Sequence, residues 1–354
     1  MDFCLLYLFL QKIFNYEPAL FFKIKAHLFY KFKSNSELKR VAKLYLNFET
    51  RTEIINRYNH ISLWDVSQIT DMNGLFRDYS VFDPQILFNE SSFEPYQLYF
   101  DYQFNEDLNA WDVSKVKDMS GMFEGCFRFN KPLNKWDVSK VKNMDNMFKY
   151  CSHFNQDLNS WNTKSLTSAH KMFYCCKYFR KPLSKWKMEK VKDTSYMFYN
   201  CIRFNSKLNK WNVSRVENMQ SMFKFCHKFN RSLHQWDVSK VICMNSMFEA
   251  CHKFNKSLNN WKPVNCIYTK DMFRFCYNYN MSIENWCVPN LEDMSGMFSY
   301  TNYNSPIQKL KIPKVILMNE MFSSSSFNQP INDWDLSKVK SLFGFLMRCS
   351  RKRV

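Results

Sequence analysis

The sequence predicts an α/β repeat solenoid in which each unit of 24–25 residues contributes one short parallel strand and one short helix. The first observation is a period, because tryptophan recurs every 25 residues and a fixed short period is typical of stacked repeats. The second is that a strand-like half and a helix-like half alternate within each unit. The third is composition: 18% aromatic residues and 20 Met against 5 Gly can fill a continuous core. The tryptophans in strict step are Trp111, Trp136, Trp161, Trp186, Trp211, Trp236, Trp261 and Trp286.

The two halves of one unit differ in their apolar spacing. The strand-like half is Leu-x-x-Trp-x-Val, as in Leu133, Trp136 and Val138, where Trp and Val alternate with a polar residue. The helix-like half is Val-x-x-Met-x-x-Met-Phe, as in residues 141–148, a spacing that puts four apolar side chains on one side of a helix. Neither half can bury its face alone. We therefore expect stacked copies to form ladders of Trp, Met and Phe, with the strands paired in one parallel sheet.

Residues 1–59 are expected to form a helical N-terminal segment and cap. Ser36 and Thr50 are each placed to start a short amphipathic helix that would cover the first coil. The apolar run at 3–10 is too short to cross a membrane and lacks the flanks of a signal peptide. A buried helix is the favoured interpretation, and a membrane-surface anchor formed by residues 1–33 is the alternative.

The repeat array is expected to span residues 60–343. An insertion at 77–103 interrupts it, and its aromatic residues would either pack on the array or present an apolar patch. Residues 344–354 should form a C-terminal cap and a basic tail, with a helix over 341–350. One Asn per unit is expected to satisfy the backbone of the coil turn and the next Asn side chain, with a break at Arg180. These residues are Asn130, Asn155, Asn205, Asn230, Asn255 and Asn280.

Seven of the 13 cysteines occupy one repeat position, between two aromatic core positions. Such a position suits a small buried thiol, and an odd-numbered ladder is a poor disulfide framework. Reduced cysteines, and hence a reducing compartment, are therefore expected. The seven are Cys126, Cys151, Cys176, Cys201, Cys226, Cys251 and Cys276.

Motifs for catalysis or cofactor binding are missing from the sequence. It contains no glycine-rich phosphate loop, no Cys-x-x-Cys and no His-Glu-x-x-His. The pairs Cys226–His227 and Cys251–His252 imitate a zinc site, but the cysteine should point inward and the histidine elsewhere. We expect no catalytic residue, no cofactor and no metal. The repeated carboxylates form a row rather than an acid–base pair: Asp112, Asp137 and Asp237.

The whole unit, W-D-V-S-K-V-x-x-M-x-x-M-F-x-x-C-x-x-F-N-x-x-L, resembles the BspA-like repeat, also called the mycoplasma lipoprotein repeat of unknown function. Its Leu-x-x-Trp-x-Val half is similar to the strand of a leucine-rich repeat. The resemblance covers residues 60–343, and residues 36–67 resemble the segment that opens such arrays. It implies a non-enzymatic binding or surface protein, as found on bacterial surfaces and in large DNA viruses. An intracellular or viral form, in the cytoplasm of a host cell, is expected, with the virion or a cell surface as alternatives.

The expected function is protein binding by a monomer through the exposed strand face. In a leucine-rich arrangement the residues that flank Trp and Val face outward, and three units depart there from the common set. An acidic partner is favoured by the net charge of +18. The candidate partner-binding residues are Lys185, Lys187, Glu189, Lys262, Lys309 and Lys311.

Two alternative functions remain open at this point. The first is a surface or membrane-associated adhesin anchored by residues 1–33. The second is a basic nucleic-acid-binding scaffold, disfavoured because its basic row has no exposed aromatic stacking partners by pattern. That row consists of Lys115, Lys140, Lys190, Arg215, Lys240, Lys314 and Lys338.

Overall fold

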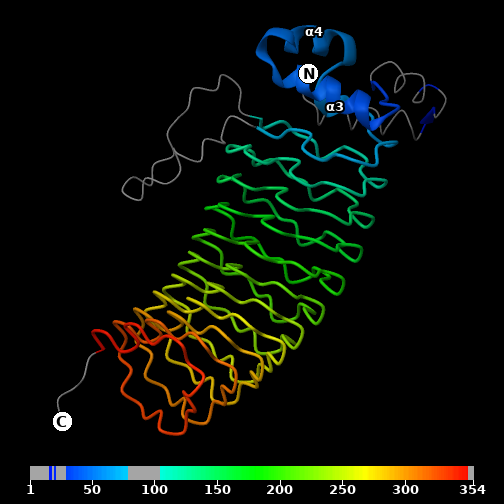
Figure 1. Ribbon diagram of the computed structural model, residues 1–354. Coiled ribbons are helices and arrows are strands. Elements are labelled where there is room, and N and C mark those ends of the chain that lie inside the picture. Colours follow the sequence, from blue (N-terminus) through cyan, green and yellow to red (C-terminus); the bar gives the residue numbers. More distant parts are fainter. Residues whose placement is uncertain (1–15, 18–19, 21–28, 79–103, 350–354) are drawn as a thin grey trace.

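A computed structural model describes residues 16–17, 20, 29–78 and 104–349 of the protein. These residues form a stack of coils, with two helices at its N-terminal end (Figure 1). Most of the N-terminal segment 1–33, nearly all of the insertion expected at 77–103 and the basic tail 350–354 lie outside the described residues. The expectations for those segments therefore stay predictions.

The expectation of one strand and one helix per unit is wrong. Within the described residues, the regular elements are helix α3 (Asn35–Leu46), helix α4 (Phe48–Tyr58) and the short 3-10 helix η1 (Ile61–Leu63). Neighbouring coils are joined by isolated parallel bridges, such as the one between Asn143 and Ser168, and no continuous strand forms among the described residues. The coils are therefore built from turns and not as an α/β, leucine-rich-type array.

The helix-like half of each unit is a run of tight turns. Two of its residues have positive φ, as at Asn146 (57°) and Tyr150 (65°), which breaks an α-helix. Alternate N–H groups donate to the next coil, as from Phe148 to the carbonyl of Met172 at 2.9 Å, instead of to a carbonyl four residues earlier. The intervening N–H groups close turns over three residues within the coil, as from Met147 to Met144. The Met and Phe side chains are buried as the spacing predicts, but turns place them there.

The strand-like half is joined to its neighbour by a side chain. The backbone N–H of Trp136 donates within its own coil, to the carbonyl of Leu133. Its indole Nε1 donates to the carbonyl of Leu108 in the preceding coil at 2.9 Å, and the same bond recurs at 2.8–3.0 Å for the eight tryptophans in strict step. These tryptophans are 1–4% exposed. Their rings form a stack, as for Trp136 and Trp161, whose centroids lie 6.3 Å apart with 4° between the planes. Each indole thus fills the core and links two coils.

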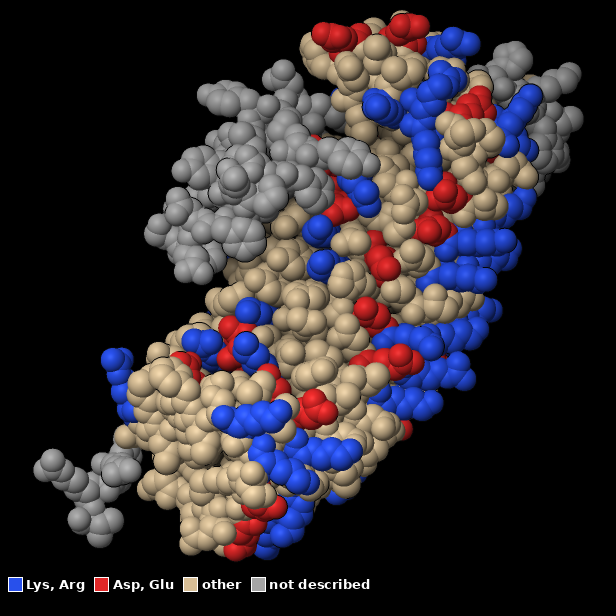
Figure 2. Space-filling view, in the orientation of Figure 1, with Lys and Arg blue, Asp and Glu red and all other residues tan. Residues whose placement is uncertain are grey.

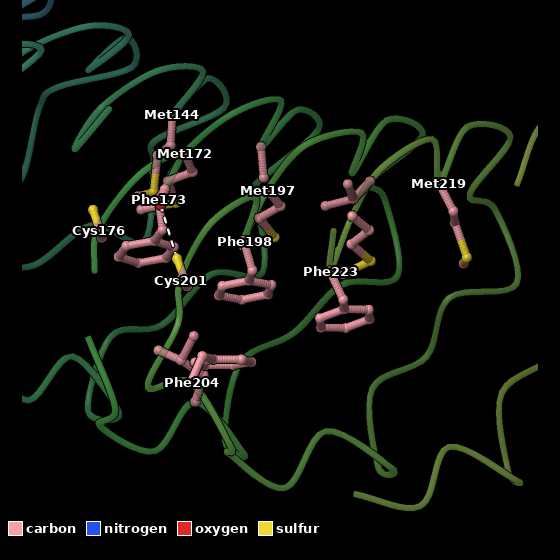
Figure 3. Close-up of a cluster of buried hydrophobic side chains, with 14 of the residues drawn as sticks. Met144, Met172, Phe173, Cys176, Met197, Phe198, Cys201, Phe204, Met219 and Phe223 are labelled. Atoms are coloured by element: carbon pink, nitrogen blue, oxygen red, sulfur yellow. Dashed lines mark hydrogen bonds between the residues drawn. The ribbon is translucent and has the colours of Figure 1, made fainter. Parts of the chain in front are cut away.

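Cysteine and asparagine supply the other links between coils. The Sγ of Cys201 donates to the carbonyl of Phe173 in the preceding coil at 3.0 Å (Figure 3). Burial raises the pKa of this thiol, and the 12 cysteines that the structure describes are all free. The Oδ1 of Asn130 accepts from the backbone N–H of Asn155 at 2.9 Å, so the Asn ladder links each side chain to the backbone of the next coil. At Arg180 the backbone still donates to the preceding Asn, but the side chain offers no amide to the next coil.

Two helices cover the first coil, as expected, with shifted starts. Ser34, not Ser36, caps α3, and Asn47, not Thr50, caps α4; in each case the side chain accepts a backbone N–H of the first turn. Tyr45 of α3 is buried edge-on against Trp64, with ring centroids 5.5 Å apart.

The helix expected over residues 341–350 is also wrong. Residues 341–349 repeat the turn structure of the coils, with positive φ at Gly344 and Arg348. Leu342, Leu346 and Met347 are exposed, and Phe343 is 71% exposed. No helix among the described residues covers this end of the stack.

Candidate binding surfaces

The aspartate that follows five of the ten tryptophans has a structural role. The Oδ1 of Asp137 accepts the backbone N–H of Ser139 at 2.9 Å, which closes the turn after Trp136. Hydrogen bonds from Ser139 lower the pKa of this carboxyl. The aspartate row is therefore a set of turn-closing groups: the same bond forms at Asp65, Asp112, Asp237 and Asp335.

The candidate partner-binding residues lie in units that lack this aspartate. Lys187, Lys262 and Lys311 replace it. At the first of these, Thr163 of the preceding coil bonds the backbone of the lysine itself: its Oγ1 accepts from the backbone N–H of Lys187 at 2.7 Å and donates to its carbonyl at 2.9 Å. The Nζ of Lys262 donates to the carbonyl of Asn285 at 2.7 Å.

All six candidate partner-binding residues are exposed, but they do not form one cluster. Asn212 and Asp237 occupy the same repeat position in the two coils between Lys187 and Lys262. The six therefore occur along one side of the stack in separate groups. Their role in binding stays a prediction. They are Lys185, Lys187, Glu189, Lys262, Lys309 and Lys311.

A shallow groove of about 620 Å³ is lined by residues from five coils of the C-terminal half. Lys240 and Lys314, from the predicted basic row, line it, and Ile242 and Ile267 supply its apolar surface. Ile242 is 41% exposed. The remaining lining residues are Glu217, Asn265, Asn290 and Glu292.

The polar side of this groove is ordered by hydrogen bonds. The Nδ2 of Asn265 donates to the carbonyl of Ser239 at 2.8 Å, and the Nδ2 of Asn290 donates to the carbonyl of Val264 at 3.0 Å. The Nζ of Lys314 then donates to the Oδ1 of Asn290 at 2.7 Å. These bonds hold the amides in place, so the groove is preformed.

Sequence reasoning missed the two isoleucines, although the repeat alignment contains the signal. This repeat position holds Lys117, Lys142 and Lys192 in the N-terminal half, whereas the C-terminal half has Ile242, Ile267 and Ile316 there beside Glu292 and Lys340. A position that faces solvent has no structural need for isoleucine, so the change of polarity marks a surface feature.

The residues that imitate a zinc site do not converge. The rings of His227 and His252 stack on the surface with centroids 4.3 Å apart. The Sγ atoms of Cys226 and Cys251 point into the core and donate to the carbonyls of the Phe residues 28 positions earlier. Burial lowers the pKa of both imidazoles. In the part of the chain that the structure describes, no three His, Cys, Asp or Glu side chains are grouped to hold a metal.

Among the described residues, no helix combines the length and apolar character that a bilayer crossing requires.

Comparison with known proteins identifies the repeat. Four overlapping stretches of the chain, 42–100, 90–211, 172–286 and 269–352, match one family, described as "Mycoplasma protein of unknown function, DUF285". No curated protein and no solved structure matches the chain. Because the four matches run from helix α3 to the last described coils, the chain belongs to this mycoplasma-type repeat family.

Proposed function

We propose that this protein is a non-catalytic repeat protein of the BspA-like type that binds a protein partner. The observation that supports this function is the preformed groove around Ile242 and Ile267, bordered by Lys240 and Lys314. A partner that covers the exposed part of Ile242 and the half-buried Ile267 would gain about 25 cal/mol for each Å² of apolar surface removed from water. An apolar centre within a charged rim is the usual composition of a protein-binding surface.

The charges in the groove favour a protein over a nucleic acid at this position. Glu217 and Glu292 lie among its lining residues and would repel phosphates. The Oε1 of Glu217 also pairs with the Nζ of Lys192 at 3.2 Å. A protein segment with apolar side chains and acidic groups could meet the isoleucines and the two rim lysines together.

The partner can be captured from host-cell lysate on the immobilised full chain, and its affinity for purified variants then measured by calorimetry. Ile242→Asp with Ile267→Asp should weaken binding roughly tenfold or more, because each change loses apolar contact and leaves a carboxylate facing the partner. The matched control is Lys142→Asp with Thr167→Asp, at the same repeat position in the polar half, which should leave the affinity within about twofold.

A second variant tests the residues that the sequence singled out. Lys187→Glu with Lys262→Glu should weaken the same complex without lowering the melting temperature, since both side chains are exposed. Unchanged affinity would show that neither lysine contacts the partner. Equal losses of affinity in the isoleucine variant and its control would show that the groove is not the binding site.

A further inference from the structure

We infer that a different side of the stack binds single-stranded nucleic acid. This surface, here named the aromatic–basic edge, follows the ladder cysteine in seven consecutive coils. It consists of residues 127–132, 152–157, 177–182, 202–207, 227–232, 252–257 and 277–282. It shares no residue with the groove, so the inference goes beyond the proposed function and can fail independently of it.

The first argument is charge. The seven stretches contain eleven Lys and Arg residues and one acidic residue, Asp157. None of these eleven cations takes part in an ion pair among the described residues. In Figure 2, many Lys and Arg side chains lie in one column along a long side of the stack. A row of eleven cations with one carboxylate among them is an electrostatic site for a polyanion.

The second argument is a line of surface rings between these cations. The ring of His153 lies 4.6 Å from Phe127 and 5.4 Å from Tyr178, which belong to the coils on either side. The guanidinium of Arg203 lies over the ring of Tyr178 at 4.6 Å. Tyr178 therefore has His153 and Arg203 on either side of its ring, and its 41% exposure leaves the outward edge of the ring open.

The same arrangement recurs further along the edge. The rings of His227 and His252 stack at 4.3 Å with 8° between their planes, and Tyr277 follows at 4.9 Å from His252. Tyr277 is 47% exposed. The exposed cations Lys228 and Lys253 stand beside these rings, each next in sequence to one of the histidines. The edge therefore has two ring clusters, each with adjacent cations.

The shape of the edge selects the occupant. Successive coils are roughly 5 Å apart, so the edge is a narrow line of rings and cations and not a broad face. A single strand offers unpaired bases that stack on exposed rings and phosphates that pair with cations. A duplex hides its bases and leaves the tyrosines without a role. A membrane would require cations spread over a plane.

The test uses the full chain and a fluorescein-labelled 20-nucleotide oligothymidylate, with binding followed by fluorescence anisotropy between 50 and 200 mM salt. The logarithm of the binding constant should fall linearly with the logarithm of the salt concentration. Arg203→Gln with Lys228→Gln and Lys253→Gln should lower the slope by about 2, because each phosphate contact on a single strand contributes about 0.7. The matched control is Lys115→Gln with Lys140→Gln and Lys190→Gln, on the row that the sequence suggested, and it should leave the slope unchanged.

The tyrosines separate stacking from plain charge attraction. Tyr178→Ala and Tyr277→Ala should each weaken binding about fivefold or more, which corresponds to the smallest loss expected for one stacked base. Tyr178→Phe and Tyr277→Phe keep the ring and should bind normally. Melting curves check that each variant is folded. No binding at 50 mM salt, equal losses in edge and control variants, or full binding by both alanine variants would each overturn the inference. Tighter binding of a duplex or of phosphatidylserine vesicles would also overturn it. The groove variant Ile242→Asp with Ile267→Asp should bind the oligonucleotide normally, which distinguishes this site from the protein-binding groove.

Discussion

The two ends of the stack are finished in opposite ways. At the N-terminal end, α3 and α4 cover the first coil, and ion pairs from Lys39 to Asp71 and from Arg51 to Glu106 tie the helices to the coils. At the C-terminal end the last described coil repeats the interior pattern and exposes Leu342, Phe343, Leu346 and Met347. The last described coil therefore shares the backbone pattern of an interior coil but has no described coil beyond it. The stability of a residue should depend on how many coils contact it.

The largest expected effect contrasts the middle of the stack with its open end. Trp211→Ala should lower the free energy of unfolding by about 3–5 kcal/mol, because the indole is buried between two tryptophan rings and bonded to Leu183 at 2.8 Å. Trp334→Ala should cost less than half as much, since Trp334 is 7% exposed and its bond to Ile307 is 3.3 Å long. Urea unfolding of both variants measures the difference, and equal losses would show that position in the stack does not matter.

The next effect tests the closed end. Tyr45→Ala should cost about 3 kcal/mol, because the ring is fully buried against Trp64 and lies under the guanidinium of Arg51 at 4.7 Å. Phe48→Ala is the matched control in the neighbouring helix, since Phe48 is 76% exposed, and it should change stability by no more than about 0.5 kcal/mol. If both variants unfolded at the same urea concentration, the two helices would not stabilise the first coil.

The smallest effect tests the open end. Phe343→Ser should change the free energy of unfolding by less than about 0.5 kcal/mol, because the side chain is 71% exposed. It should also reduce self-association at high concentration, measured by sedimentation velocity, because it removes the largest part of the exposed apolar end. A stability loss above about 1 kcal/mol would mean that this end is covered in solution.

The buried residues were predicted correctly from the sequence, but the backbone conformation of the coils was not. Both outcomes have one physical reason. Apolar residues spaced by three and four face one side of a helix, but consecutive turns of three residues achieve the same for a segment as short as 141–148. The decisive difference is the direction of the N–H groups, which hydrophobic spacing does not report. One signal was present: all five glycines of the chain have positive φ, at the two repeat positions where other units place residues such as Asn146 and Tyr150. Glycine adopts that conformation freely, so its placement indicated turns.

The binding surfaces were harder to predict. Aromatic residues were assigned to the core because most of them fill core positions, yet Tyr178 and Tyr277 lie one or two residues after the ladder cysteine position and face outward. The isoleucines of the groove are likewise single departures within a uniform repeat. Both features depend on which side chains neighbouring coils bring together, which a comparison of units one at a time does not show.

The tryptophan bond of each coil reaches only the coil before it, always 28 residues back along the regular part of the array. Removing or inserting one whole unit would therefore recreate the same joint, with a new indole on an equivalent carbonyl. The number of coils is thus free to change while the cross-section stays constant. Distances along such a stack change in steps of one coil. Duplication or loss of a coil can therefore set the separation between the two ring clusters of the edge. It can set the distance from the edge to the helical cap in the same way.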